Sequence, residues 1–469
     1  MADWQQELEA VVGAQHVLTH PNLLRAYSQD GYTLESAMPR AVVLPGSTEE
    51  TQSVVRILAR HGVPVVARGA GTSLSGGAIA SQDSVILHFS RLNRIHQIDW
   101  TNRVTEVGPG VINADVSRAL QPGGYFYAPD PSSQQACTIG GNFAENSGGP
   151  HCLKYGVTVN HVLMADVVLP NGEVRRFGNL AGDPDGPDWL GLLVGSEGTL
   201  GIATRLWLRM TPSPRASRTI AALFDSVAEA SHAVSAVIAA GVIPAALEMM
   251  DRLAIFAVEK GAYPVGYPPD TAAVLLMEID GEPLGVEAEA QQVLSLLEGF
   301  HVRQVKTAQS LEERNLWWAN RKTAFGAMGL ISPRYYVQDG VIPRHTLPIA
   351  LDAIDSISAH YDIRIANVFH AGDGNLHPLL LYDDRDPREV SRVKRAGSEI
   401  LRYCVELGGS ITGEHGIGLE KLDEMRVQFS PEALLAHDAI KRVFDPAALF
   451  NPGKLLPTPG RCIDYDGPP

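Results

Sequence analysis

The chain has 469 residues and carries 38 lysines and arginines against 53 aspartates and glutamates, a formal net charge of −15. Hydrophobic residues make up 45% of it and charged residues 19%, which is typical of a folded protein of two or three domains and excludes intrinsic disorder. The acidic balance argues against non-specific binding to nucleic acid or to an anionic membrane surface.

Cysteine usage and the N-terminal sequence indicate a reducing compartment. The chain has four cysteines, and none forms the C-x-x-C spacing of an iron–sulfur or zinc site. The first residues are acidic and helix-like, without the basic and apolar regions of a signal peptide. Apolar stretches fall short of the roughly 20 residues that a membrane span needs. We therefore expect a cytoplasmic protein.

The first predicted elements form a β-α-β unit. Residues Ala41–Pro45 are apolar enough for a buried strand, and the S-x-x-E pattern at Ser47–Glu50 indicates the start of a helix that ends at His61-Gly62. A second strand is expected at Val63–Ala67. The N-terminal half is therefore predicted to begin as an α/β structure.

Three glycine-rich segments lie beside predicted strand ends or turns: Arg68–Gly77, Pro129–Gly156 and Gly195–Ile202. The first matches neither G-x-G-x-x-G nor the Walker A pattern, so by itself it fits either a phosphate-binding nest or a plain glycine-rich turn. Together the three segments indicate an extended ligand held against bare backbone, because packing alone rarely needs so many glycines.

The order of these motifs resembles a known family. RGAGTSLSGGA, IGGN-x-AEN-x-GG and GSEGTLG resemble the FAD domain of the vanillyl-alcohol-oxidase/p-cresol-methylhydroxylase flavoproteins. With FHAGDGNLHP, GGSITGEHGIG and FDPAALFNPGK, the likeness extends over residues 39–457 to FAD-linked 2-hydroxy-acid oxidases and dehydrogenases, the flavin subunits of bacterial glycolate oxidases among them. The resemblance implies that FAD is bound by Arg68, Gly69, Ala70, Gly71, Thr72, Ser73, Gly76, Gly77, Pro129, Asp130, Ser132, Gly140, Gly141, Asn142, Asn146, Gly148, Gly149, Tyr155, Gly156, Glu197, Gly198, Ile202 and Asn451.

The expected fold class is α+β, with a two-part FAD-binding domain of the p-cresol-methylhydroxylase type and an α+β cap built on an antiparallel sheet. Strands at Thr219–Phe224, Ala272–Asp280 and Tyr335–Ile342 alternate with helices at Ser226–Ala240 and Gly285–Glu298, which predicts helices over one face of that sheet. The expected domains are 1–214 for FAD, 215–418 for the cap with its metal site, and 419–469 for a C-terminal segment that returns to the FAD domain.

A histidine pair stands out in FHAGDGNLHP. Asp373-Gly374 is a strong signal for a two-residue hairpin loop. With that loop, His370 and His377 face each other directly across two strands, at a Cβ separation of about 4.5–5.5 Å. Two imidazoles so close together can share a metal ion.

Glu414 is the expected third metal ligand, because glycines flank it on both sides and place it on a turn. Two histidines, one carboxylate and an open position are typical of a catalytic metal site. Spacing alone fits equally well a pair of surface histidines with an unrelated glutamate; the resemblance favours the metal. Zinc suits the donors, and Mn²⁺ or Fe²⁺ remain alternatives.

His415, next to Glu414, is the predicted general base for the substrate hydroxyl. Arg321 is the predicted anchor for the substrate carboxylate. By itself Arg321 fits a solvated helix residue as well, and the resemblance favours the anchor. Tyr335, Tyr336 and Met249 are weaker candidates for the substrate pocket.

The resemblance implies oxidation of a small 2-hydroxy acid to a 2-oxo acid, most simply glycolate to glyoxylate, by metal-assisted hydride transfer to FAD. Apolar residues at Val337 and Leu379, where relatives that act on 2-hydroxyglutarate have polar ones, favour glycolate or lactate. The alternatives are a D-lactate or other D-2-hydroxy-acid dehydrogenase that acts alone, a non-catalytic flavin subunit, and an oxidase of a phenol, a sugar lactone or a cell-wall precursor.

Electron transfer from the reduced flavin requires an acceptor, and this chain has no cysteine cluster for an internal relay. The resemblance implies two partners, a second flavin-domain subunit and an iron–sulfur subunit of a glycolate oxidase complex. Contact with the inner face of the cell membrane is then expected through those partners.

Overall fold

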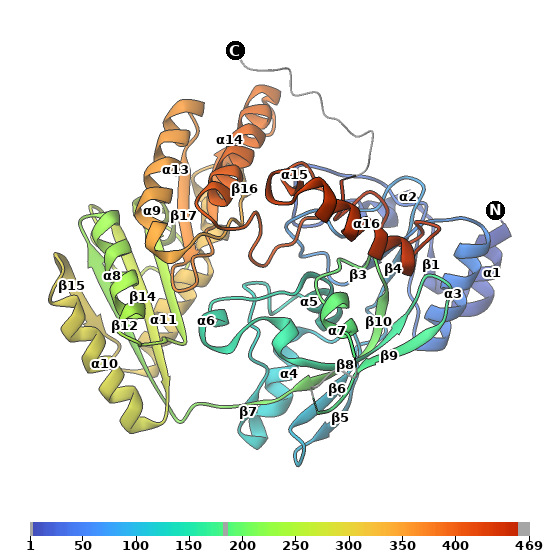
Figure 1. Cartoon of the computed structure of the whole chain (residues 1–469), viewed down its shortest axis with the longest axis horizontal. Coiled ribbons are helices and arrows are strands. Elements are labelled where there is room, and N and C mark those ends of the chain that lie inside the picture. The colour runs from blue at the N-terminus through green and yellow to red at the C-terminus, as the bar shows by residue number, and fades with distance from the viewer. Residues whose placement is uncertain (1–2, 182–185, 458–469) are drawn as a thin grey trace.

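A computed structural model describes residues 3–181 and 186–457. Figure 1 shows two lobes, one built from the N-terminal half and the other from the green to orange part of the chain, with the C-terminal helices (red) lying back against the N-terminal lobe. The α+β class predicted from the sequence is confirmed.

The N-terminal lobe begins with a four-stranded sheet in the order β1-β2-β4-β3. Its strands are β1 (Val17–Leu18), β2 (Ala41–Val43), β3 (Val65–Arg68) and β4 (Val85–His88). Helix α3 (Thr48–Arg60) connects β2 to β3, both of which run parallel to β4. Ser47 caps this helix by accepting a hydrogen bond from the backbone N–H of Glu50 at 3.1 Å.

A five-stranded antiparallel sheet in the order β5-β6-β10-β8-β9 completes this lobe. Its strands are β5 (Ile95–Asp99), β6 (Val104–Val107), β8 (Val162–Val168), β9 (Val174–Gly178) and β10 (Ile202–Arg209). The other elements are α1 (Asp3–Val12), α2 (Pro21–Leu24), α4 (Asn113–Leu120), β7 (Tyr125–Phe126), α5 (Ile139–Glu145), α6 (Cys152–Tyr155), α7 (Trp189–Leu193) and β11 (Thr211–Pro212).

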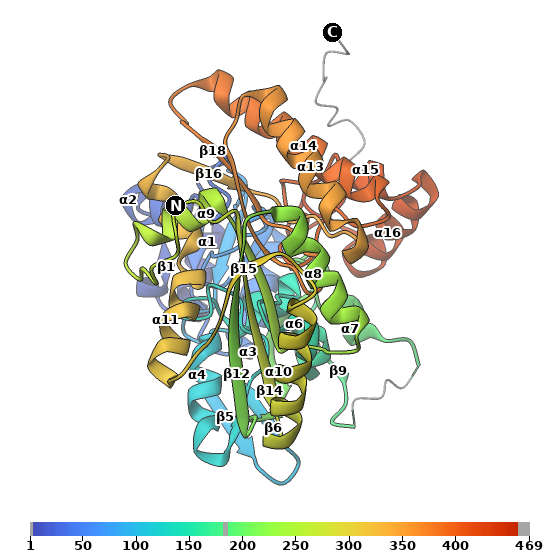
Figure 2. The same cartoon turned by 90° about the vertical axis from the view of Figure 1, so that its left-hand side faces the viewer.

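The C-terminal lobe is built on a seven-stranded sheet in the order β15-β12-β14-β13-β17-β18-β16, with antiparallel neighbours throughout (Figure 2). The strands are β12 (Ala216–Phe224), β13 (Ala246–Asp251), β14 (Ala273–Gly281), β15 (Val302–Thr307), β16 (Arg334–Val337), β17 (Ile365–His370) and β18 (Pro378–Tyr382).

Helices cover both faces of this sheet, whereas the sequence predicted one covered face. Apolar side chains on one face pack against α8 (Val227–Ala239), α10 (Pro283–Leu297), α13 (Leu347–Tyr361) and α14 (Pro387–Glu406). Those on the other face pack against α9 (Arg252–Glu259), α11 (Leu311–Lys322) and α12 (Ala324–Ala327). Strands buried on both faces lose the alternation of apolar and polar residues, which is why β14 is uniformly apolar over most of its length.

The C-terminal segment carries α15 (Met425–Gln428) and α16 (Pro431–Phe444) and then pairs with the N-terminal lobe. Phe450 forms a parallel bridge with Val65, and Leu449 and Phe450 are buried in the core around the four-stranded sheet. The precise domain limits stay a prediction. Within residues 3–181 and 186–457, no helix is long and apolar enough to cross a membrane.

Candidate active site

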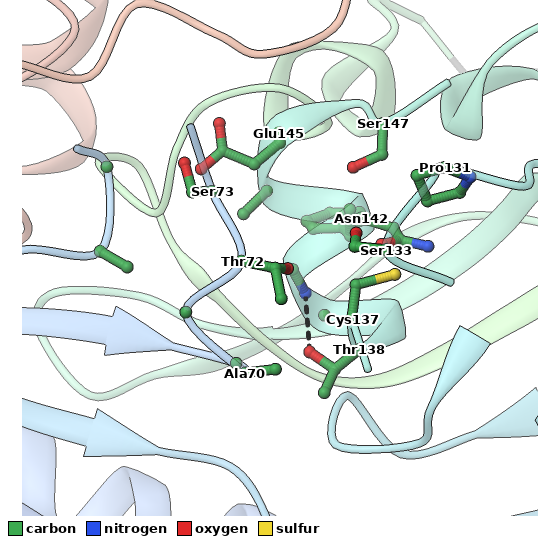
Figure 3. Close-up of a pocket in the computed structure, with 18 of the residues that line it drawn as sticks. Ala70, Thr72, Ser73, Pro131, Ser133, Cys137, Thr138, Asn142, Glu145 and Ser147 are labelled. Carbon is green, nitrogen blue, oxygen red and sulfur yellow. Dashed lines mark hydrogen bonds between the residues drawn. The ribbon is translucent and has the colours of Figure 1, made fainter. Parts of the chain in front are cut away.

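A cavity of about 360 Å³ lies between the two lobes, and all three glycine-rich segments reach it. Figure 3 shows its N-terminal wall, where Ser73 and Glu145 lie together on one side, and Cys137 and Thr138 on another. The predicted residues that line it are Arg68, Gly69, Ala70, Gly71, Thr72, Ser73, Gly77, Ser132, Gly140, Gly141, Asn142, Glu197, Gly198, Ile202, Arg321, His370, His377, Glu414 and His415.

The remaining predicted FAD ligands are Gly76, Pro129, Asp130, Asn146, Gly148, Gly149, Tyr155, Gly156 and Asn451, and they lie outside this lining. Some of them support it: Asn451 donates from Nδ2 to the backbone oxygens of Gly77 at 3.0 Å and Glu197 at 2.8 Å. Tyr155 instead donates its hydroxyl to Asp280 at 2.6 Å, across the two lobes. A direct contact of these residues with FAD stays a prediction.

Glycine is required where the loops meet. A Cβ at Gly69 would lie 2.2 Å from Oγ1 of Thr138, and a Cβ at Gly140 would lie 2.6 Å from Cβ of Pro109. Thr138 Oγ1 also accepts a hydrogen bond from the backbone N–H of Gly141 at 3.3 Å, drawn dashed in Figure 3. The backbone thus forms the cavity wall, as an extended dinucleotide requires.

Arg68 shapes the first glycine-rich loop. Its guanidinium donates to the backbone oxygen of Ala78 at 3.2 Å, just after the end of the loop, and to that of Gln29 at 2.7 Å in an earlier segment of the chain. Gly71, at φ +73°, leaves room for that guanidinium, because a Cβ there would lie 2.1 Å from Nη2. Arg68 therefore orders the loop in addition to lining the cavity.

The fit to FAD is supported by polar groups that face the cavity without partners. Among the described residues, Nδ2 of Asn142 and Oε2 of Glu145 are buried and have no hydrogen-bond partner. Burial and the neighbouring carboxylate of Glu197 raise the pKa of Glu145 well above its ordinary value, which favours the protonated form of this carboxyl. A ligand rich in hydrogen-bonding groups would satisfy both atoms.

Sequence reasoning missed several residues of the lining. Phe89, Pro109, Lys322 and Phe325 lie outside the glycine-rich segments and reach the cavity only through the fold. The others lie inside those segments, between the residues that were predicted: Leu74, Pro131, Ser133, Cys137, Thr138, Phe143, Glu145, Ser147 and Ser196.

The predicted register of the histidine hairpin is wrong by two residues. Asn367 pairs with Pro378 and His370 with Asn375, so the loop has four residues, 371–374, instead of two. The cause is a competing partner: Ile342 donates to the oxygen of Gly374 at 3.0 Å, which pulls this turn towards residues 340–342. A shift of two keeps each side chain on its face of the sheet, so His370 and His377 still meet, as a diagonal pair.

The two imidazoles converge on Glu414. Nε2 of His370 and Nε2 of His377 each lie 3.3 Å from the same carboxylate oxygen, Oε1 of Glu414. The ring centroids of the histidines are 5.1 Å apart. Nδ1 of His377 faces the backbone oxygen of Gln338 at 3.3 Å, which assigns the proton to Nδ1 and leaves the lone pair on Nε2. One cation among these three atoms would satisfy all of them.

Glu248, which the sequence analysis missed, connects this cluster to Arg321. It lies opposite His370 in the pairing of β13 with β17, and its Oε1 is 2.7 Å from His370 Nδ1. Its Oε2 forms an ion pair with Nη2 of Arg321. Burial alone would lower the pKa of His370, but the carboxylates of Glu248 and Glu414 raise it well above its ordinary value. The two carboxylates therefore favour a positive charge at His370. A carboxylate behind a histidine is typical of metal sites.

Arg321 is buried on α11 and lines the cavity. One of its two terminal nitrogens pairs with Glu248, and its Nε has no hydrogen-bond partner in the part of the chain that the structure describes. The arginine therefore keeps donors free for an anion. It is buried and paired with Glu248, so it is not the solvated helix residue that the sequence alone also allowed.

Asp339 holds the loop that carries Glu414 and His415. This buried carboxylate accepts from the backbone N–H of Gly413 at 3.0 Å and of His415 at 2.9 Å, and from the Thr412 hydroxyl at 2.6 Å. Asp339, His377 and His415 form a second group with metal-ligand spacing. All three donors bind the same oxygen, Oδ2, and Oδ1 accepts from the backbone N–H of Glu414 at 3.4 Å, so Asp339 fits a structural role better than that of a ligand.

His415 stacks on His377, with ring centroids 4.9 Å apart and planes at 6°. Its Nδ1 is buried and, among the described residues, has no hydrogen-bond partner. Burial lowers the pKa of His415 to about 4, so the imidazole is neutral at pH 7. A neutral ring that lines the cavity is able to accept a proton.

The weaker pocket candidates lie elsewhere. Met249 is buried in the core, and Tyr336 lines a different cavity. Val337 and Leu379 pair with each other across β16 and β18 inside the core on the other face of the sheet. Phe325 lines the active-site cavity instead, with its ring edge-on to His377 at 5.9 Å between centroids.

A buried ionic network joins the lobes beside the cavity. His151 lies 2.9 Å from Asp130, and Glu278 accepts from Arg314 and from the indole N–H of Trp318, both at 2.6 Å. Burial alone would raise the pKa of Glu278, but His151, whose Nε2 lies 3.9 Å from Oε1 of Glu278, and Arg314 lower it to about 2. The pKa of His151 is raised to about 10 by Asp130 and Glu278, against the effect of burial.

Two family models match the chain. One describes an FAD binding domain and covers residues 39–178. The other describes the C-terminal domain of FAD linked oxidases and covers residues 213–455.

Curated relatives match almost the whole chain. It is 46% identical to the glycolate oxidase subunit GlcD of Escherichia coli K12, over 97% of this chain and 91% of that protein. The identity to the Bacillus subtilis protein of the same name is 41%, over 92% of each. A D-lactate dehydrogenase of Anaerostipes hadrus is 31% identical over 89% of this chain and 90% of its own length.

Solved structures share the fold. p-Cresol methylhydroxylase with substrate bound superposes with a TM-score of 0.80 at 19% identity, over 96% of both chains. An alkyldihydroxyacetonephosphate synthase superposes with a TM-score of 0.77 at 18% identity, over 97% of this chain and 86% of that one. The two-part architecture predicted from the glycine-rich motifs is thereby confirmed.

Proposed function

Since the chain belongs to the FAD-linked oxidase family, we propose that it oxidises a small 2-hydroxy acid to the 2-oxo acid, with glycolate as the substrate. It is an FAD-dependent oxidoreductase. The observation that carries the proposal is the convergence of His370, His377 and Glu414 in the cavity that the glycine-rich loops and Arg321 also line. Relatives named glycolate oxidase subunit and D-lactate dehydrogenase support the same substrate class.

The residues of the cavity fit both expected groups. Bare backbone at Gly69 and Gly140, together with the unpartnered Asn142 in the described structure, suits FAD. Two imidazole nitrogens and a carboxylate oxygen suit zinc, with Mn²⁺ or Fe²⁺ as alternatives. FAD would accept the hydride of the substrate, and the metal would act as a Lewis acid towards its hydroxyl.

Arg321 and His415 have distinct roles in this proposal. The free donors of Arg321 bind the substrate carboxylate, and Glu248 holds the guanidinium in place. His415 is neutral, lines the same cavity and accepts the hydroxyl proton. Asp339 positions His415 by holding its backbone N–H at 2.9 Å. Substrate binding and proton removal therefore fall to residues of the C-terminal lobe.

Phe325 favours a short substrate. Its ring lies edge-on to His377 in the cavity lining and offers no polar group. A second carboxylate on the substrate would lose hydration against that ring, and the Lys322 ammonium of the same lining is already paired with Asp130 at 3.6 Å, so burying the carboxylate is costly. Glycolate and lactate carry no such group, whereas 2-hydroxyglutarate does.

We also propose that the chain works as one subunit of a glycolate oxidase complex, with a second flavin-domain subunit and an iron–sulfur subunit as partners. Two relatives above 40% identity are named as subunits. The chain itself has four cysteines without C-x-x-C spacing, so an iron–sulfur relay would have to come from another chain.

Anaerobic flavin reduction tests the substrate. FAD-loaded protein is mixed separately with glycolate, D-lactate, L-lactate and D-2-hydroxyglutarate, and bleaching of the flavin absorbance is followed. Fastest bleaching by glycolate supports the proposal, and fastest bleaching by D-lactate would assign the chain to the dehydrogenases instead. Failure of all four acids to bleach the flavin would contradict the proposal for the isolated chain.

A further inference from the structure

A second cavity, of about 600 Å³, shares no lining residue with the first. It lies where the N-terminal lobe, helix α14 and the C-terminal segment meet, and it is lined by Tyr32 from the first and Leu401 from the second. Cavities at such junctions are frequent ligand sites, and this volume suits a small organic molecule.

The amines at this cavity already have partners. Lys454 donates to the backbone oxygens of Gly77, at 2.8 Å, and Ile79, and to Oδ1 of Asn451 at 2.7 Å. Lys394 forms an ion pair with Glu35 at 3.0 Å. Neither ammonium is left to neutralise the other carboxylates of the lining.

Glu420 is the carboxylate without a full set of partners. Its side chain is 1% exposed, and Oε1 accepts from Nε2 of Gln338 at 3.2 Å. Oε2 has no hydrogen-bond partner among residues 3–181 and 186–457; the ammonium of Lys421, 3.6 Å away, is shared with Asp339. Burial raises the pKa of Glu420 to about 7, although Lys421 and the hydroxyl of Tyr336 act against this effect.

We propose that the second cavity binds a small organic cation, with its ammonium on Oε2 of Glu420 and its apolar body against Tyr32 and Tyr336. The two tyrosine rings, with centroids 6.2 Å apart, offer aromatic surface that attracts such a cation. Asp423 and Glu424 also line the cavity, which disfavours an anion.

A metal ion fits this cavity less well. In the part of the chain that the structure describes, both groups with metal-ligand spacing belong to the active site. Glu424 already accepts from the hydroxyl of Ser398 at 2.5 Å. The occupant therefore needs one localised positive charge and an apolar body.

Isothermal titration calorimetry of the FAD-loaded protein tests the proposal with benzylammonium chloride and its neutral analogue benzyl alcohol. We expect one benzylammonium per chain, bound about tenfold or more tightly than benzyl alcohol, since a hydrogen bond to a charged group is worth about that factor. Glu420→Gln should remove this preference. Glu298→Gln, the same change at an exposed position on the C-terminal side of α10, should keep it.

Equal binding of the two probes by the unmodified protein, or no binding of either, would overturn the proposal, and neither result depends on how a variant folds. An undiminished preference for benzylammonium in Glu420→Gln would place the bound cation elsewhere and overturn it too. Flavin absorbance and circular dichroism establish that the variants are folded.

Discussion

Glu248 lies opposite His370 in the pairing of two strands, and its carboxylate reaches Nδ1 of that histidine at 2.7 Å. The same carboxylate forms an ion pair with Arg321 through its second oxygen. One buried side chain thus orients a proposed metal ligand and the proposed substrate anchor together. A change at Glu248 should therefore affect metal binding and substrate binding at once.

The first prediction concerns Glu248→Gln, which keeps the shape of the side chain and removes its charge. We expect metal affinity to fall about 10- to 100-fold, because the carboxylate behind a metal-bound histidine sets its tautomer and basicity. Metal retained after dialysis against a metal buffer is the measurement. Metal retention equal to that of the Glu298→Gln control would show that Glu248 does not support the site.

The second prediction concerns Arg321→Lys, which keeps the positive charge but loses the planar fork. We expect kcat/KM for glycolate to fall about 10- to 100-fold, with unchanged FAD content, because a lysine cannot hold Glu248 and a carboxylate in the same geometry. Arg252→Lys, the same change at an exposed position on α9, is the control and should retain activity. Unchanged steady-state kinetics in Arg321→Lys would show that Arg321 does not bind the substrate carboxylate.

The third prediction concerns Gly69→Ala. The new Cβ would lie 2.2 Å from Oγ1 of Thr138, so the loop has to move away from the second glycine-rich segment. Crowding of this kind costs about 1–3 kcal/mol, which corresponds to a roughly 5- to 150-fold loss of FAD affinity. The FAD content of the purified protein measures it.

Gly285→Ala on α10 is the matched control for that substitution, because in the described structure its Cβ would meet open space. It should retain a full complement of FAD. If Gly69→Ala bound FAD as tightly as Gly285→Ala, the first loop would not form the wall of the cofactor cavity.

The fourth prediction concerns pH and the network that joins the lobes. Because the pKa of Glu278 falls from an ordinary 4.5 to about 2 on folding, its stabilisation is present above pH 4.5 and is lost as the pH falls towards 2. The pKa of His151 rises from 6.5 to about 10 on folding, so the stabilisation that His151 contributes is present below pH 6.5 and is lost as the pH rises towards 10.

Glu278→Gln should therefore lower the thermal midpoint of unfolding most between pH 4.5 and 6.5. In that range we expect the free energy of unfolding to fall by about 3 kcal/mol. The difference from the unmodified protein should shrink on both sides of that window. A difference that does not change with pH would show that the ionic pairs contribute nothing beyond packing.

Sequence reasoning reached the residues that lie in long motifs. The motifs predict the glycine-rich loops, the paired histidines and Glu414, the family resemblance adds Arg321, and the structure brings most of them to one cavity. The sequence does not indicate Glu248, because this residue lies 122 positions from His370 in a segment that looks like any core strand. Contacts of that kind depend on strand register, which no local pattern specifies.

The errors have local causes as well. Asp373-Gly374 favours a two-residue turn, but pairing of residues 374–376 with 340–342 imposes a longer loop. The same pairing ends β16 at Val337, five residues before the predicted end of that strand at Ile342, and so brings Asp339 under the loop of Glu414. In both places a tertiary contact overrode a sound local signal.

We propose that His370, His377 and Glu414 hold one divalent metal on which glycolate oxidation depends. It is tested most directly by measuring metal content and anaerobic flavin reduction by glycolate in one sample before chelation, after it, and after a divalent metal is restored. We predict one metal ion per chain, loss of reduction when it is removed with FAD still bound, and recovery when Zn²⁺, Mn²⁺ or Fe²⁺ is added. Metal-free protein that is reduced by glycolate as fast as the untreated protein would contradict the account.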